Sequence, residues 1–476
     1  ARAGSNRDRI LGGLRVLGLG AVTGVIGALV GAALIVPALQ FTSVSLRQSG
    51  LGVQDQLSFT AVFHYLTMVR GQSTAHTGAP AEIAFAPGIG VLLLAPLAFF
   101  RRRWLALGLL AGVVACLFIA VGARTPVLPF LAAHLPGFGY FRAPARIWFV
   151  AEVALSVMAG LGFEWLLAGR QTLRVLQVAV IVLLAANLWQ LDQPLLNIFP
   201  SSPGFTPLPI ELAAAKQTQG QRIYGVQRNV RQAVTSELNV QLADGQDPLQ
   251  VASYVRYMRF AGGYQYSGYA LAIPPFEVYD TGWPTYQKAQ PDAHLLGLVN
   301  VGVVVSRYKL TDPSLVQVGD VQGTFVYRNR AVQPRAFLVS ASLGQTLTRL
   351  DINDFTTLAR SGAVAPDAAV GQSSVAVGPS GELAVAVDAR QPAFLVVGNP
   401  SYPGWQAIID GRPAPLVKVG GVLEGVAVPA GAHIVDIVYR PVAVWLGLAL
   451  CLLGLVGAAG WTAWFTRRSR RRAALR

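Results

Sequence analysis

Residues 442–465 read VAVWLGLALCLLGLVGAAGWTAWF, and none of these 24 side chains is charged. A helix needs about 20 mostly apolar residues to cross ~30 Å of hydrocarbon, so this run is long enough to span a membrane. The whole chain has a similar character, because 53% of its 476 residues are hydrophobic and only 13% are charged. This composition excludes an ordinary soluble enzyme and predicts a membrane protein.

Five more apolar runs precede residues 442–465, and each is long enough to be read as a membrane-spanning helix. The predicted fold is therefore a polytopic α-helical membrane protein. Residues 1–191 form a region of five spans, and residues 442–476 form the last span with a basic tail. The five earlier runs are residues 16–39, 83–100, 104–121, 147–168 and 173–191.

Lysine and arginine in the short segments between spans indicate which side of the membrane each segment occupies. Fifteen basic residues lie before the first span, between the second and third, between the fourth and fifth, and after the last, when Arg174 at the start of the fifth span is counted with the segment before it. The loops on the other side, residues 40–82 and 122–146, hold five. We therefore expect both termini to be cytoplasmic and residues 192–441 to form one large extracytoplasmic domain.

The formal net charge of +15 arises outside this outer domain, since residues 192–441 contain 18 basic and 18 acidic side chains. The excess lies mainly in the flanks of the spans, where it meets anionic lipid headgroups. No basic face with interleaved aromatic residues occurs elsewhere, so membrane lipids are an expected partner and nucleic acid is not.

The cysteines, Cys116 and Cys451, both fall within predicted spans. The outer domain is therefore expected to contain no disulfide. No Cys/His framework with metal-ligand spacing occurs, so the residues themselves assign no metal site and no cofactor.

Glycines recur through the first predicted span. Small residues four positions apart allow a second membrane helix to approach closely, so this span is predicted to pack tightly through them. The glycines are Gly20, Gly24, Gly27 and Gly31.

The outer domain divides by composition into a mixed α/β part, residues 192–320, and a β-sandwich-like part, residues 321–441. Asp247 followed by Pro248 is typical of a helix start, and Asp410 followed by Gly411 is typical of a hairpin turn. Short apolar strands separated by glycine and proline indicate the sandwich. The predicted strands are residues 301–306, 323–328, 335–340, 382–388 and 393–397.

Three stretches together are similar to one family, the bacterial YfhO-type membrane proteins. The first is GYFRAPARIWFVAEVALSVMAGLGFEWL, residues 139–166. The second combines LLGLVNVGVVVSRYKL, residues 295–310, with VYRNRAVQPRAFLV, residues 326–339. The third begins NPSYPGWQAIIDGRP at residue 399 and runs to the last span. The resemblance covers most of the chain.

The resemblance implies a relative of the GT-C glycosyltransferases in a bacterial cell membrane. Such enzymes take sugars from polyprenyl-phosphate donors on the outer face of the membrane, here for transfer to an envelope glycan. The superfamily also implies inversion at the sugar, an acidic base and a divalent cation. Its acidic motif lies in the first outer loop of a longer bundle, so this chain resembles the C-terminal part of such an enzyme, with the catalytic acid outside it.

The stretch around Pro144 is the predicted site for the lipid phosphate. Proline suits the first turn of a helix, and arginine binds phosphate through two parallel hydrogen bonds. We therefore expect Arg142 and Arg146 to hold the carrier phosphate; the alternative is that they contact ordinary headgroups or pair with Glu152. Glu152 itself is either a general base or the partner of one of these arginines.

Further candidates come from the outer segments. Asp55 and Glu82 are the carboxylates to test if the chain is a complete enzyme, although solvated loop residues show the same irregular spacing. Aromatic rings stack on sugars, but they also fill domain cores, so both readings stay open for the predicted glycan-binding residues. These are Tyr264, Tyr266, Tyr402 and Trp405.

Two rival functions remain. One is a non-catalytic scaffold that binds an envelope glycan through the β-sandwich. The other is a transporter, which is disfavoured because few polar or charged residues lie in the middle of the spans.

Overall fold

The structure is a computed structural model that falls into two compact units, residues 1–48 with 202–476 and residues 49–201. The parts of the chain that it describes are residues 6–46, 88–135, 138, 144–167, 174–192, 206–247, 250–265, 272–275, 289–378 and 381–474. The first unit contains the strands together with three apolar helices, and the second contains helices from the middle of the apolar region.

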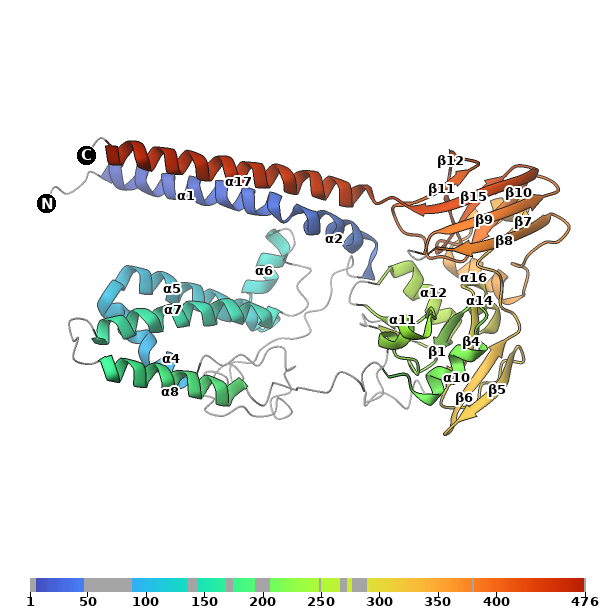
Figure 1. Ribbon diagram of the computed structural model, residues 1–476, viewed down its shortest axis with the longest axis horizontal. Coiled ribbons are helices and arrows are strands. Elements are labelled where there is room, and N and C mark those ends of the chain that lie inside the picture. The colour runs from blue at the N-terminus through green and yellow to red at the C-terminus, as the bar shows by residue number, and fades with distance from the viewer. Residues whose placement is uncertain are drawn as a thin grey trace. The chain divides into compact units, whose positions relative to one another are not determined.

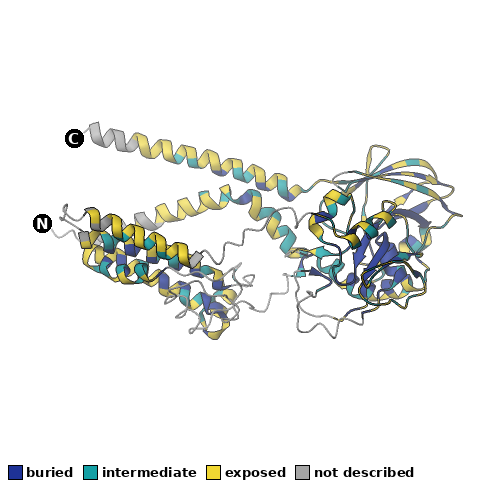
Figure 2. Cartoon of the chain, turned by 60° about the horizontal axis from the view of Figure 1, so that its bottom comes forward, coloured by how far each residue is buried: buried dark blue, intermediate teal, exposed yellow. Residues whose placement is uncertain are grey.

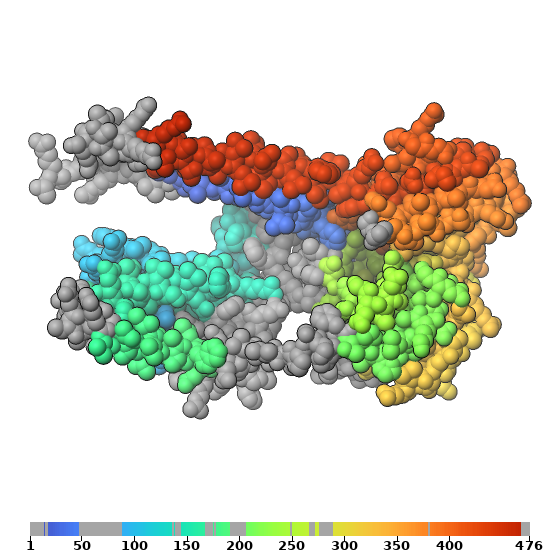
Figure 3. All heavy atoms as spheres, in the orientation of Figure 1, coloured from blue at the N-terminus to red at the C-terminus, as the bar shows by residue number. Residues whose placement is uncertain are grey.

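Two long helices and one short helix form the apolar part of the first unit: α1 (Asn6–Val30), α2 (Ala32–Val44) and α17 (Val442–Ala474). Within α17, Val442–Arg467 is apolar over 26 residues, a length of ~39 Å at 1.5 Å per residue. α1 runs beside α17 (Figures 1 and 3). The start of α1 and the end of α17 lie at the same end of the pair (Figure 1).

The first predicted span is not one straight helix. α1 and α2 meet at Gly31, and the apolar parts on the two sides of this break are bent by 70°. Pro37 lies inside α2 and cannot donate the helical hydrogen bond to the carbonyl four residues earlier. Glycine also weakens a helix interior, so residues 16–39 form a broken segment.

Two glycines of α17, rather than the glycines of α1, allow α17 to approach α1 and α2 closely. A Cβ built on Gly454 would lie 2.7 Å from the backbone nitrogen of Val30, and one on Gly447 would lie 2.6 Å from the carbonyl oxygen of Ala32. The prediction that Gly20, Gly24 and Gly27 mediate tight packing is wrong for this unit, since a Cβ on any of them meets open space.

A four-stranded sheet with the order β1-β4-β6-β5 organises the first part of the β-rich region. β1 and β4 are parallel, and the other pairs are antiparallel. Helices and short strands surround this sheet, and its core includes Tyr224, Tyr257 and Leu295. The elements are α10 (Pro209–Gln217), β1 (Arg222–Gly225), η10 (Gln232–Val234), α11 (Thr235–Leu238), β2 (Gly245–Gln246), α12 (Ala252–Gly262), β3 (Ala272–Ile273), α14 (Ala293–Leu298), β4 (Val301–Ser306), β5 (Leu315–Val321) and β6 (Thr324–Asn329).

Two further sheets, with the orders β13-β14-β10-β7 and β12-β11-β15-β9-β8, form the β-sandwich. Their inward side chains share one core; β9, for example, buries Leu383, Val385 and Val387 and exposes the residues between them. The elements are β7 (Ala336–Ser340), α15 (Ala341–Arg349), α16 (Ile352–Arg360), β8 (Gly371–Val377), β9 (Leu383–Ala389), β10 (Ala393–Val397), β11 (Trp405–Ile409), β12 (Arg412–Ala414), β13 (Val417–Val419), β14 (Leu423–Val428) and β15 (Gly431–Tyr439).

The boundary between the two parts lies later than predicted. The division at residues 320 and 321 falls inside β5, which pairs with β6 in the first sheet, so by strand pairing the sandwich begins at β7. The predicted helix start at Asp247 is also wrong, because α12 begins at Ala252 with Val251 as its N-cap. Val251 instead forms a bridge with Ser45.

Helices make up the described residues of the second unit. A core of small residues around Trp148 joins α5 to α7. The backbone of α5 is not helical at Arg102, where φ is −143° and ψ is 73°, so the predicted turn at residues 101–103 falls on an interruption. The elements are α4 (Ile89–Leu94), η4 (Ala95–Leu97), α5 (Ala98–Ala120), η5 (Gly122–Arg124), α6 (Val127–His134), η7 (Pro144–Ile147), α7 (Trp148–Leu167) and α8 (Arg174–Asp192).

The described residues contain three helical segments long and apolar enough to cross a membrane, or four if the bent α1–α2 pair is one span. The three are residues 89–120, 144–166 and 442–467, and the apolar part of α8 is shorter. Most residues on these helices are exposed, whereas the strands carry much of the buried core (Figure 2). The structure thus combines apolar helices with a β-rich C-terminal half. The topology of six spans stays a prediction.

Candidate functional site

The predicted helix start at Pro144 is confirmed. Pro144 opens the single turn η7, which leads directly into α7. Pro144 and Ala145 are buried, while Arg146 is exposed, so a backbone turn packed into the helix core presents this guanidinium at the surface. Arg142, the other arginine of the predicted phosphate site, lies outside the described residues.

Glu152 lies in the second turn of α7. Residues four or seven apart share a helix face, and by this spacing Glu152 lies on the same face as Ser156, Ala159 and Phe163. The other two predicted carboxylates, Asp55 and Glu82, lie outside the described residues.

This face of α7 lines a cavity of about 280 Å³ between α4, α7 and α8. Its walls are mainly apolar, and Ser156 and Asn187 are the polar side chains among them. Gly160 widens it, because a Cβ on this residue would meet open space. Other lining residues are Val91, Leu94, Ala159, Phe163, Ile181, Leu184 and Leu188.

The two predicted aromatic residues of the sandwich, Tyr402 and Trp405, pack against other aromatic rings, one of them in α2. The Tyr402 ring lies 5.1 Å from that of Phe41 in α2 and 6.1 Å from that of Tyr439 at the end of β15. Trp405 packs on Tyr439 at 5.2 Å. Because the rings of Tyr402 and Trp405 contact other rings, packing in the domain explains these two residues better than stacking on a sugar.

The other two predicted aromatic residues are Tyr264 and Tyr266. Tyr264 is only 4% exposed and packs against Gly262, where a Cβ would come within 2.6 Å of its ring. A sugar cannot stack on a ring buried in this way. Tyr266 lies outside the described residues.

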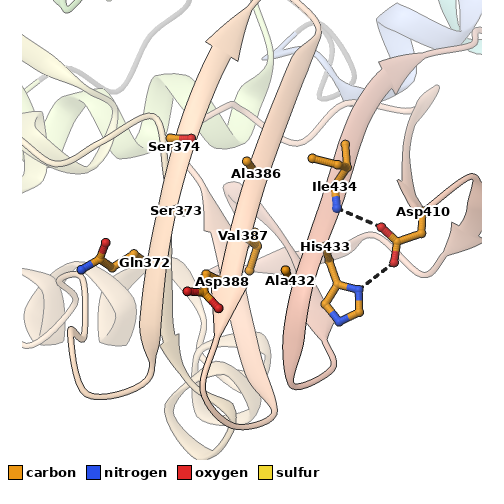
Figure 4. Close-up of a pocket in the computed structure, with 10 residues that line it drawn as sticks. All are labelled: Gln372, Ser373, Ser374, Ala386, Val387, Asp388, Asp410, Ala432, His433 and Ile434. Carbon is orange, nitrogen blue, oxygen red and sulfur yellow. Dashed lines mark hydrogen bonds and ion pairs between the residues drawn. The ribbon is translucent and has the colours of Figure 1, made fainter.

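A groove of about 520 Å³ lies on the outer face of the sheet that contains β8, β9 and β15. Figure 4 shows that its polar side chains come from neighbouring strands. Gln372, Asp388 and Ala432 stand side by side across the three strands, and Ser374, Ala386 and Ile434 form the next row. Alanine in the floor leaves the hollow, and the carboxylate and amide of the first row provide hydrogen-bonding groups at one end.

An Asp–His pair borders this groove (Figure 4). Asp410 Oδ2 lies 2.7 Å from Nδ1 of His433, and Asp410 Oδ1 accepts a hydrogen bond of 2.9 Å from the backbone nitrogen of Ile434. The hydrogen bond to Asp410 raises the pKa of His433, and the same bond lowers the pKa of Asp410. The pair is therefore ionic from weakly acidic pH up to the raised pKa of the imidazole.

Sequence reasoning did not find this groove. It recognised Asp410 only as part of a turn. The signal that would have found it is cross-strand register: Asp388 and Ala432 are partners in an antiparallel pair, and side chains of directly opposed residues lie together.

Among the described residues, no group of three or more His, Cys, Asp or Glu side chains is arranged to hold a metal ion. The divalent cation implied by the GT-C resemblance stays a prediction.

No protein-family model matches this chain, and no curated protein or solved structure does. The resemblance to YfhO-type proteins therefore also stays a prediction.

Proposed function

We propose that this protein uses polyprenyl-phosphate-linked sugars at the outer face of a bacterial cell membrane, as the C-terminal part of a GT-C-related glycosyltransferase. The observation that supports donor binding is the apolar cavity between α4, α7 and α8. An isoprenoid chain is apolar and matches such walls. In this reading Arg146 contacts the phosphate, and the acceptor glycan lies in the groove on the sandwich.

The arrangement of the first unit supports this placement in the membrane. The start of α1 and the end of α17 lie at one end of their pair (Figure 1), and both segments are rich in arginine. α17 begins three residues after β15 ends, so the sandwich joins the other end of the pair. Positively charged flanks favour the cytoplasmic side of a membrane, so we infer that the β-rich region lies outside.

Filling the cavity should abolish donor binding. A photoactivatable farnesyl phosphate would be cross-linked to the full chain in membranes. We expect Gly160→Phe to lower labelling at least tenfold without loss of folding, because the space beside Gly160 is open. Val150→Phe, at a 51% exposed position on α7, is the matched control and should label normally. Full labelling of Gly160→Phe would contradict the proposal.

The second candidate is a non-catalytic scaffold that binds an envelope glycan. The groove beside Asp410 and His433 favours it, since carboxylate, amide and imidazole groups hydrogen-bond sugar hydroxyls. If polysaccharide binding depends on Asp388 while the cavity takes up no isoprenoid phosphate, the scaffold is the correct function.

A further inference from the structure

Two arginines are buried together where the first sheet meets the sandwich. Arg222 is the first residue of β1, and Arg335 lies just before β7. Each is only 8% exposed. Both donate to the same acceptor, Oδ1 of Asn399, over 3.1 Å, so their guanidinium groups are neighbours.

All hydrogen-bond acceptors of these two side chains among the described residues are neutral. Arg222 donates through one terminal nitrogen to the carbonyl oxygens of Val299 and Gly398, each over 3.0 Å. Arg335 also donates to the side-chain oxygen of Gln241. Neither guanidinium forms an ion pair with a carboxylate in the described part of the chain.

Several donors are left over. A guanidinium group has five N–H donors, and the bonds above use three on Arg222 and two on Arg335. The remaining five N–H groups, two on Arg222 and three on Arg335, belong to adjacent cations in a largely buried place.

Burying two adjacent cations among neutral partners costs free energy, because each loses its hydration and no opposite charge offsets this loss. The same subdomain shows the usual solution at Arg231, whose guanidinium bonds both carboxylate oxygens of Glu211, each over 2.8 Å. Burial is the main cause that lowers the pKa of Arg335, and the positive charge of the neighbouring Arg222 lowers it further, to about 9. Arg335 is therefore still charged at neutral pH.

We propose that Arg222 and Arg335 form a binding site for a small oxyanion, a phosphate or carboxylate group, at the junction between the first sheet and the sandwich. The planar arginine fork matches both groups through paired hydrogen bonds. The source of the anion is either free phosphate or an acidic substituent of a glycan. This site lies in the β-rich region, so the test of anion binding does not depend on whether the cavity between α4, α7 and α8 binds a lipid donor.

The test is thermal unfolding of the full chain in detergent, with inorganic phosphate titrated against sodium chloride of equal ionic strength. A ligand that binds only the folded protein raises the unfolding temperature. We expect a saturable rise with phosphate that chloride does not produce. A second titration with glucuronate distinguishes the sources: a tighter response to glucuronate points to an acidic glycan, and a tighter response to phosphate points to the free ion.

Variants assign the effect to this site. Arg335→Lys keeps the charge without the fork and should weaken the apparent phosphate affinity about tenfold, whereas Arg335→Gln should abolish the response. Arg390→Gln removes an exposed arginine on the same domain and should respond like the unchanged chain. If Arg335→Gln does not fold, Arg335→Lys decides. Absence of a saturable phosphate response, or an unchanged response in Arg335→Lys, overturns the proposal.

Discussion

Replacing Glu211 by alanine should destabilise the β-rich region more than removing an exposed carboxylate from the same region. The Glu211 carboxylate is fully buried and accepts four hydrogen bonds. They come from the backbone nitrogens of Leu208 and Arg231 and from two nitrogens of the Arg231 guanidinium, at 2.7–2.9 Å. The change removes the partner of Arg231 and the cap of α10 together.

Removing one partner of a buried ion pair costs about 3–5 kcal/mol. Arg231 is 33% exposed and can regain water, so we expect about 3 kcal/mol. This lowers the unfolding temperature by roughly 6–12 °C for a region of this size. Glu237→Ala, at an exposed position on α11, is the matched control and should have little effect.

The Glu211 contribution should also depend on pH. Burial alone raises the pKa of this carboxyl, but the hydrogen bonds from Arg231 and Leu208 outweigh it and the pKa is lowered. A group whose pKa is lower in the folded state stabilises the protein above its ordinary pKa and loses this contribution as the pH falls through the folded value. Calorimetry should therefore show that the gap between the unchanged chain and Glu211→Ala narrows on acidification. A gap that is constant or widens would contradict this explanation.

Gly454→Val should separate α17 from α1. A Cβ at this position would come within 2.7 Å of both Leu29 Cβ and the backbone nitrogen of Val30. Backbone atoms cannot yield by rotating a side chain, so we expect the helix pair to lose about 1–3 kcal/mol. Reversible unfolding of the purified chain in mixed SDS micelles measures this loss.

Two glycine controls make the comparison specific. Gly457 lies one turn further along α17, and Gly24 lies on α1; a Cβ on either meets open space. Gly457→Val and Gly24→Val should therefore unfold at nearly the same SDS fraction as the unchanged chain. Equal effects at Gly454 and Gly457 would show that the packing of α1 on α17 is different.

Local chemistry predicted several elements well. The apolar runs Val301–Ser306 and Ala393–Val397 are strands with the predicted bounds, because turn-forming residues delimit each of them. The turn at Asp410 and Gly411 is also confirmed, since both residues have positive φ, 48° and 80°, between paired β11 and β12. Asp followed by Gly is one of the residue pairs that such two-residue turns prefer.

Features that depend on distant contacts were not predictable in this way. α12 starts later than its capping signal indicates, because Val251 pairs with Ser45 and the carbonyl oxygen of Gln250 accepts a hydrogen bond from Leu46. Glycine spacing in α1 did not identify which helix provides the close contact. The groove and the two buried arginines likewise combine residues that are distant in sequence, such as Arg222 and Asn399, 177 positions apart.

The proposed sidedness of the β-rich region is the central claim, and cysteine labelling tests it most directly. Cys116 and Cys451 would be replaced by alanine, and single cysteines placed at Thr357, exposed on α16, and at Ser469 in the last turns of α17. An impermeant maleimide added to intact cells should modify the Thr357→Cys protein at once and the Ser469→Cys protein only after lysis. Modification of Ser469→Cys but not Thr357→Cys in intact cells would contradict the account.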